Sequence, residues 1–434
     1  MKVSKKIKSL VGIITGLTLI LTGCSSSQDS NSGKTEVTLL IGKDEIVKQL
    51  DETISEYNKS QDKYMVKTIS LAGQNPTEKI TSLYASGNAP TIMHTGVFSE
   101  LEQFKDKILD LTDMDLIKGI DKEYLKTTTF DGKTMAVPCT VEAFGFIYNK
   151  DVLDEAVSGD FKPESIKNRN DLESLFKKIE KIDGKSALQI SPMDWSLGAH
   201  FTNLFFTNQS NNLDERHKFM ENISSGDANL KDNKVYNNWV DTFDLMKRYN
   251  VSKDAPLSVE YDDTTIAMAS GDIGMWFMGN WAYPQLKEAN PDGNYRFLPV
   301  PISTEDEAYG NNQISVGVPA SWAIDKEQSS KEEQEGAKDF LTWLYTDEIG
   351  QDYYVNKLGF IPIHKDTKVK PDDPLAKDVV EYMKDNNTLE WMNTYYHPTA
   401  YPTMGASLQK YLDGKINRDG LTNEIEDYWK SQGE

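Results

Sequence analysis

Side chains that could carry out catalysis occur throughout this chain, but their spacing matches no catalytic or metal-binding motif. The five histidines are scattered over 434 residues, with no H-E-x-x-H run and no cysteine and histidine pattern typical of zinc. The glycine-rich loops that hold nucleotide phosphates and the G-x-S-x-G turn of a serine nucleophile are missing as well. The sequence therefore predicts no metal site, no bound cofactor and no catalytic residues.

One pair of acids keeps an enzymatic alternative open. Glu142 and Asp194 could act as the two carboxyl groups of a secreted glycoside hydrolase. Such a pair must stand about 5 to 9.5 Å apart across the scissile bond. The chain has 68 aspartates and glutamates, so solvated surface acids account for nearly all of its carboxylates. We therefore expect a protein that is not an enzyme and keep the hydrolase as a rival hypothesis.

Cys24 is the residue whose surroundings predict a covalent modification. Four lysines precede an apolar run from Leu10 to Leu21, which is the pattern of a secretory signal. The run is much shorter than the roughly 20 residues that a helix needs to cross a bilayer. The sequence LTGC that ends at Cys24 resembles the bacterial lipobox, in which the cysteine becomes the lipidated N-terminus. We expect residues 1–23 to be a lipoprotein signal peptide, and Cys24 to hold the protein on the extracytoplasmic face of the bacterial cell membrane.

The segment after Cys24 and the overall charge limit the possible partners. Residues 24–35 are mostly small and polar, which predicts a flexible tether. Cys139 is the one other cysteine, so no intramolecular disulfide is expected if Cys24 carries lipid. The net charge is −21, and removal of the four signal lysines would make it −25 (−21 − 4). This charge argues against nucleic acid and anionic lipid as binding partners.

Helices and strands alternate after the tether, which is typical of an α/β fold with a parallel sheet. Ligands of such sheets bind at the carboxyl ends of the strands, so the loops at 42–44, 73–75 and 95–98 are expected to face a cleft. Later in the chain, Ser330 and Glu333 predict a capping box at the start of a helix. The expected elements are strands at 37–41, 64–71, 91–95, 273–278 and 314–324, and helices near 46–57, 80–84 and 331–344.

Five short motifs, taken in order, resemble one protein family. They are VEAFGFIYNKD (141–151), GKSAL (184–188), GMWFMGNWAY (274–283), VGVPASWAI (316–324) and AKDFLTWLYTDEIG (337–350). The set is similar to the maltose-binding-protein branch of the family 1 extracellular solute-binding proteins, which serve sugar ABC importers. The resemblance implies the two-lobed type II periplasmic-binding-protein fold, with a mainly parallel sheet flanked by helices in each lobe.

The same resemblance implies how the chain is divided. Crossings between the lobes are expected near 141–144, 314–319 and 356–361, and the lobes are expected to close over ligand like a hinge. The expected ranges are 36–143 and 315–357 for the N-lobe, and 144–314 and 358–434 for the C-lobe.

The resemblance also implies which residues contact a sugar. Sugar rings present hydroxyl pairs and a patch of C–H groups, so a site needs planar polar groups beside aromatic faces. Trp281 follows a buried strand and matches the stacking Trp of the family. Glu142 could instead form a hinge salt bridge, Trp195 could be core, and the loop after the first strand could simply be solvated. The expected ligand-binding residues are Glu142, Asp194, Trp195, Trp281, Tyr401, Lys43 and Asp44, with Trp391 and Tyr396 as alternatives to Tyr401 in the same loop region.

Departures from the maltose receptors leave the ligand open. Thr91 stands where the family usually has Asp, and the later Trp and acid of those receptors fall on Thr95 and Phe98. These departures put maltose itself in doubt, and we expect a monomeric receptor that captures an oligosaccharide or another sugar and delivers it to ABC permease subunits. A receptor for a polyamine, a metal ion or another small solute, and a sensor domain that signals to a membrane kinase, remain alternatives.

Overall fold

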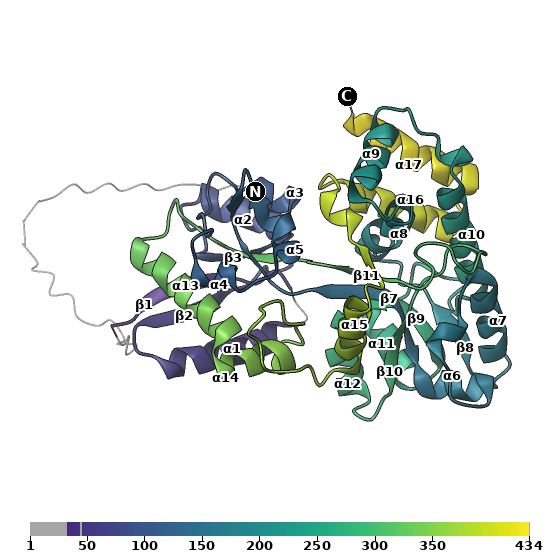
Figure 1. Ribbon diagram of the computed structural model, residues 1–434, viewed down its shortest axis with the longest axis horizontal. Coiled ribbons are helices and arrows are strands. Elements are labelled where there is room, and N and C mark those ends of the chain that lie inside the picture. The colour runs from purple at the N-terminus through teal and green to yellow at the C-terminus, as the bar shows by residue number, and fades with distance from the viewer. Residues whose placement is uncertain (1–32, 44–45, 434) are drawn as a thin grey trace, which may run out of the picture.

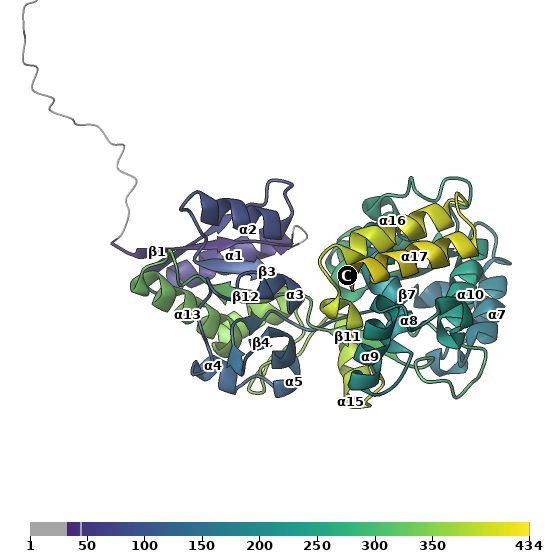
Figure 2. The same ribbon diagram turned by 90° about the horizontal axis from the view of Figure 1, so that it is seen from above.

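The computed structural model describes residues 33–43 and 46–433, and it has two lobes joined by extended segments (Figures 1 and 2). Each lobe has its own β-sheet with helices packed against it, so the predicted two-lobed α/β fold is confirmed. Cys24 and Asp44 lie outside the described residues. In the part of the chain that the structure describes, no helix is long and apolar enough to span a bilayer.

The N-lobe is built around a five-stranded sheet in the order β2-β1-β3-β12-β6. The first three strands pair in parallel as predicted, and β12 returns antiparallel to β3 from late in the chain. The predicted capping box of α13 is confirmed at Ser330 and Glu333. The strands are β1 (Thr35–Leu40), β2 (Tyr64–Ile69), β3 (Ile92–Thr95), β4 (Thr129–Phe130), β5 (Lys133–Thr134), β6 (Val137–Pro138) and β12 (Ser321–Ile324). The helices are α1 (Val47–Ser60), α2 (Pro76–Ala85), α3 (Ser99–Glu102), α4 (Asp115–Lys118), α5 (Lys122–Leu125), α13 (Lys331–Thr346) and α14 (Glu348–Asp352).

The C-lobe sheet has the order β13-β11-β7-β9-β8, with β10 paired to β7. It is mixed rather than mainly parallel, because β7 runs antiparallel to β9, β10 and β11. The strands are β7 (Glu142–Asn149), β8 (Ser186–Gln189), β9 (Ile273–Gly279), β10 (Tyr295–Leu298), β11 (Ile314–Gly317) and β13 (Thr388–Glu390). The helices are α6 (Lys150–Val157), α7 (Arg169–Ile179), α8 (Thr202–Thr207), α9 (Leu213–Ser224), α10 (Lys234–Tyr249), α11 (Tyr261–Ala269), α12 (Tyr283–Ala289), α15 (Pro374–Lys384), α16 (Ala400–Leu412) and α17 (Arg418–Gln432).

The chain passes between the lobes next to β7, next to β11 and before α15. After α14 it stays hydrogen-bonded to the N-lobe side, because the Ile361 amide donates to Thr140 Oγ1 at 2.9 Å and the Lys365 amide donates to the Gly119 carbonyl at 2.9 Å. The helix α15 then packs on β10 and β11 of the C-lobe. We therefore propose that the third crossing follows Lys365, later than the boundary at 357/358 that the sequence predicts.

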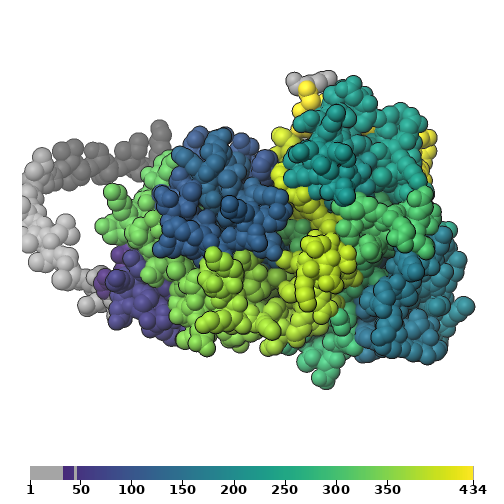
Figure 3. All heavy atoms as spheres, viewed as in Figure 1, coloured from purple at the N-terminus to yellow at the C-terminus, as the bar shows by residue number. Residues whose placement is uncertain are grey.

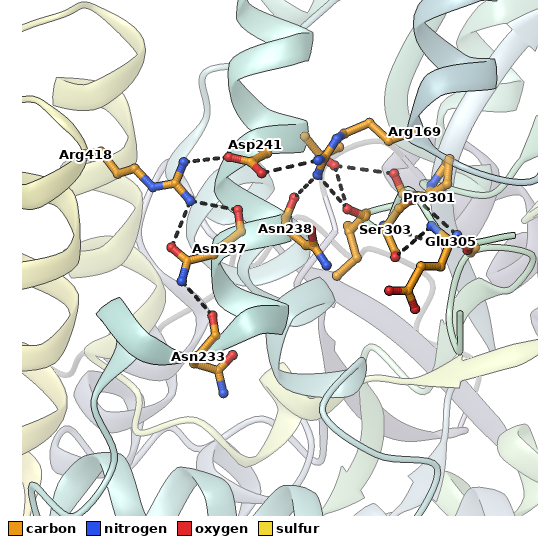
Figure 4. A network of polar contacts seen from close by, with 12 residues as sticks. Arg169, Asn233, Asn237, Asn238, Asp241, Pro301, Ser303, Glu305 and Arg418 are labelled. Carbon is orange, nitrogen blue, oxygen red and sulfur yellow. Dashed lines mark hydrogen bonds and ion pairs between the residues drawn. The ribbon is translucent and has the colours of Figure 1, made fainter. Parts of the chain in front are cut away.

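Three C-lobe helices are joined by a partly exposed polar network (Figure 4). Asp241 on α10 accepts from Arg169 at the start of α7 at 3.2 Å and from Arg418 at the start of α17 at 2.6 Å. Arg169 also donates to the Asn238 and Ile302 carbonyls, both at 2.8 Å. One carboxylate therefore joins α7, α10 and α17.

Candidate functional site

A cavity of about 770 Å³ lies between the two lobes, and both lobes and two crossing segments line it. In the space-filling view the blue and green surface of the N-lobe adjoins the yellow and teal surface of the C-lobe (Figure 3). Glu142 at the start of β7 and Pro319 after β11 line the cavity where the chain crosses. Closing or opening the hinge must therefore change the shape of this cavity.

The C-lobe wall of the cavity is aromatic. Trp281 lies in the turn after β9, and its ring centroid is 6.1 Å from that of Trp195. The His200 ring lies 5.1 Å from Trp281 and 5.5 Å from Trp391, and it stacks on Phe144 at 4.5 Å. Burial lowers the pKa of His200 to about 3, with the nearby Lys43 charge adding to the effect, so this imidazole is a neutral member of the wall.

Two glycines bring Tyr401 into this wall. Trp195 is followed by a π-helical turn over Ser196–Phe201, which packs directly on α16. A Cβ on Gly198 would come within 1.9 Å of the Tyr401 carbonyl, and one on Gly405 would come within 2.7 Å of Asp194 Cα. The close contact needs glycine on both sides, and it fixes Tyr401 near the start of α16 beside the cavity.

The N-lobe wall is polar and charged. Lys43, which follows β1, forms an ion pair with Glu142 at the first crossing segment, and both side chains are largely buried. His94 on β3 lies against Trp322, with a centroid separation of 4.6 Å. Burial lowers the pKa of His94 to about 3, again with a contribution from Lys43. Glu100 in α3 also lines this wall, and burial raises the pKa of its carboxyl.

The structure brings five of the expected ligand-binding residues to the cavity. Asp194 is not among the described residues that line it: its carboxylate accepts from the Trp195 amide at 2.7 Å. Asp194 therefore holds Trp195 rather than facing the cavity directly. The five lining residues are Lys43, Glu142, Trp195, Trp281 and Tyr401.

Sequence reasoning missed Glu100 and His200 and left Trp391 as an alternative to Tyr401. Glu100 belongs to a four-residue helix with no apolar periodicity, and His200 lies in a π-helical turn, so neither has a local signal. Trp391 directly follows β13, so strand prediction there would have placed it at the sheet edge that faces the cavity.

Several polar atoms around the cavity are shielded from solvent without a hydrogen-bond partner among the described residues. Buried polar groups are normally paired, so these atoms can accept or donate to a polar ligand when the lobes move around it. Within the described part of the chain, no group of three or more His, Cys, Asp or Glu side chains could hold a metal ion. The unpaired atoms are His94 Nε2, Thr95 Oγ1, Gln285 Oε1, Trp391 Nε1 and Asn393 Oδ1.

The fold and the cleft are shared with known proteins. Among solved structures, RafE in complex with raffinose has a TM-score of 0.77 and 20% identity, covering 92% of this chain and 100% of that chain. The apo-form of RafE from Streptococcus pneumoniae has a TM-score of 0.73 and 20% identity, over 93% and 99% of the chains. A sugar transporter from Bacillus licheniformis in complex with stachyose has a TM-score of 0.72 and 18% identity, over 92% and 100%. At these identities the similarity shows a shared fold.

Sequence comparison identifies the protein family to which the chain belongs. The multiple sugar-binding protein of Streptococcus mutans is 24% identical over 369 residues, which cover 82% of this chain and 81% of that protein. An uncharacterized ABC transporter extracellular-binding protein of Pyrococcus horikoshii is 23% identical over 340 residues, covering 76% and 70%. The family model for bacterial extracellular solute-binding proteins matches residues 52–383. Since that match spans most of the chain, this protein belongs to the bacterial extracellular solute-binding proteins.

Proposed function

We propose that this protein is the receptor of a carbohydrate ABC importer, which captures an oligosaccharide in the inter-lobe cavity and delivers it to the permease unchanged. One observation carries the proposal: Trp195, Trp281 and Tyr401 line one wall of the cavity, and the ion pair of Lys43 with Glu142 lines it beside them. Apolar C–H faces of a sugar fit the rings, and its hydroxyls fit the charged and polar groups.

The size of the cavity and the nature of the relatives support this assignment. A volume of about 770 Å³ lies within the range of roughly 300 to 1,000 Å³ that is usual for small-ligand sites. The names of three relatives refer to multiple sugars, raffinose and stachyose. These names favour a carbohydrate over a polyamine or a metal ion as the ligand class.

Binding without catalysis is part of the same proposal. Glu142 is engaged in an ion pair with Lys43, and Asp194 is held by the Trp195 amide, so neither acid of the hydrolase hypothesis is poised to donate a proton. The relatives named above are binding or transport proteins. We further propose that Cys24 carries the lipid anchor and that residues 24–35 form the tether, which would keep the receptor near its permease.

A thermal-shift experiment on the form that begins at Ser25 tests the assignment. The panel contains raffinose, stachyose, maltotriose, a polyamine and divalent metal ions. A ligand that binds the folded state raises Tm by mass action, and we expect a rise of several degrees with one carbohydrate class. The rise should be lost in Trp281→Ala and kept in Trp343→Ala, a partly buried Trp on α13 that does not line the cavity. Stabilisation by the polyamine or a metal alone, or release of reducing ends from a bound sugar, would contradict the proposal.

A further inference from the structure

Glu100 is held against the N-lobe wall by an unusually close backbone contact. A Cβ on Gly96 would come within 2.6 Å of Glu100 Cδ, 2.7 Å of Oε2 and 2.8 Å of Oε1. The carboxylate accepts from the Gly96 backbone and from Thr77 Oγ1, the latter at 3.4 Å. Glycine at position 96 thus leaves room for the carboxyl in the cavity wall, where these two hydrogen bonds hold it.

The charges around the cavity do not balance. Among the described residues that line it, Lys43 is positive and Glu100 and Glu142 are negative, which gives −1 (+1 − 2). Lys43 pairs with Glu142, and no ion pair between the described residues includes Glu100. His94 and His200 do not supply the missing positive charge, because burial lowers both pKa values to about 3.

The negative charge extends to the opposite wall. The pKa of the Tyr401 phenol is raised first by burial and then by the charges of Glu100 and Asp194. The two acids belong to opposite lobes, but Asp194 does not line the cavity. No ion pair of the described chain involves Asp194 either. Glu100 is therefore the carboxylate without an ion pair that a ligand group beside Tyr401 meets in the cavity wall, in surroundings where charges interact more strongly than in water.

We propose that Glu100 determines the charge selectivity of the cleft, so that it accepts neutral and amine-bearing oligosaccharides and excludes acidic ones such as uronates and sugar phosphates. This inference rests on the proposed carbohydrate function. A hydroxyl or an ammonium group can donate to the carboxylate, whereas an anionic substituent would be placed near like charges while losing its hydration.

The test compares matched ligands by calorimetric titration at pH 8. The probes are the neutral trisaccharide with the largest thermal shift, raffinose being tried first, and two derivatives in which a primary hydroxyl is oxidised to a carboxylate or replaced by an amine. The measured quantity is the ratio of the Kd of the acidic derivative to the Kd of the neutral sugar. We expect a ratio of at least about 10 for the native protein, and a fall of at least about fivefold in Glu100→Gln, because like charges in an interface cost on the order of several kcal/mol.

Two further variants keep the outcome clear. Glu102→Gln removes the same charge from the exposed side of α3, where Glu102 pairs with Lys105, and it should retain the native ratio. If Glu100→Gln fails to fold or to bind the neutral sugar, Glu100→Asp is measured instead, because it keeps the negative charge. A retained ratio of the two Kd values in Glu100→Asp supports the proposal, and a lost ratio overturns it. Equal binding of acidic and neutral sugars by the native protein, or an unchanged ratio in Glu100→Gln, would also overturn it. If no carbohydrate binds the native protein, the carbohydrate function itself fails, which is a different result.

Discussion

The two walls of the cavity differ in chemistry and in how they are supported. The C-lobe wall presents the rings of Trp195, Trp281 and Tyr401, set by a π-helical turn packed on α16. The N-lobe wall presents Lys43 and Glu100, which follow the carboxyl ends of β1 and β3. Ring faces bind sugars of many kinds, whereas charged and polar groups distinguish one substituent from another. We infer that the C-lobe supplies affinity and the N-lobe supplies selectivity, and that closure combines them.

The largest effect is expected where the two walls meet. Lys43→Ala removes the cationic partner of Glu142, and breaking a buried ion pair from one side costs about 3 kcal/mol or more of unfolding free energy. Urea denaturation of the ligand-free protein measures this loss. The double variant Lys43→Met with Glu142→Gln should recover most of it, because neither residue then carries a charge. An unchanged free energy of unfolding in Lys43→Ala would show that the ion pair does not stabilise the protein where the two walls meet.

The next effect concerns the aromatic wall alone. Trp281→Ala should weaken the binding of every carbohydrate ligand by about 30- to 150-fold, since truncating a ring forfeits roughly 2 to 3 kcal/mol of burial. The order of preference among sugars should stay the same, because the N-lobe wall is intact. Titration calorimetry with the full panel measures both quantities. A changed order of preference would mean that the C-lobe also selects the ligand.

A third prediction uses the histidine on each wall. The pKa values of His94 and His200 are lowered by burial from 6.5 to about 3, so the unfolded state binds more protons between these values. The contribution of these histidines to the free energy of unfolding is therefore expected to fall as pH decreases through this window, by roughly 2 kcal/mol per histidine at pH 5.

Comparison with a variant isolates the contribution of the two histidines to the free energy of unfolding. Burial raises the pKa of Asp373 to about 7, which stabilises the folded state as pH falls and opposes the histidines. Urea denaturation at pH 7.5 and pH 5 measures the free energy of unfolding of the native protein and of the double variant His94→Gln/His200→Phe. The difference between the two proteins should change between these pH values, because only the native protein contains the two histidines. His397→Gln, on the exposed loop before α16, is the control. A difference that is the same at both pH values would contradict the buried neutral state of these rings.

The smallest effect is expected at an aromatic contact between the lobes. Phe98 has a positive φ of 40°, and its ring centroid lies 5.0 Å from that of Tyr395 in the C-lobe. Phe98→Ala should loosen this contact and raise the radius of gyration of the ligand-free protein in X-ray scattering. Phe98→Gly should have the same effect on shape but be about 1 kcal/mol more stable than the Ala variant, because glycine tolerates this φ. If the Ala variant is at least as stable as the Gly variant, the backbone at position 98 is not strained by its positive φ.

Much of the fold could be predicted because its signals are local. The strands β1, β2 and β3 coincide with short apolar runs, and the residue types of Ser330 and Glu333 predict the capping box of α13. The mixed C-lobe sheet could not be predicted in the same way. Its central strand β7 pairs with β9, β10 and β11, which all lie more than a hundred residues later in the chain.

The site was predictable to the extent that family motifs cover it. Trp281 and Glu142 lie inside such motifs and line the cavity. The role of Asp194 depends on the packing of Gly405 against its backbone, and that of Glu100 depends on its contact with Gly96. Both contacts follow from tertiary structure, which leaves no periodic pattern in the sequence.

The central claim is that the cavity between these two walls binds a carbohydrate. Titration calorimetry of the form beginning at Ser25 with raffinose and stachyose, extended to the other oligosaccharides of the panel, tests it directly. We predict saturable binding of one carbohydrate molecule per chain, with affinity sharply reduced in Trp281→Ala and retained in Trp343→Ala. Absence of binding to every carbohydrate, or binding that Trp281→Ala leaves unchanged, would contradict the account.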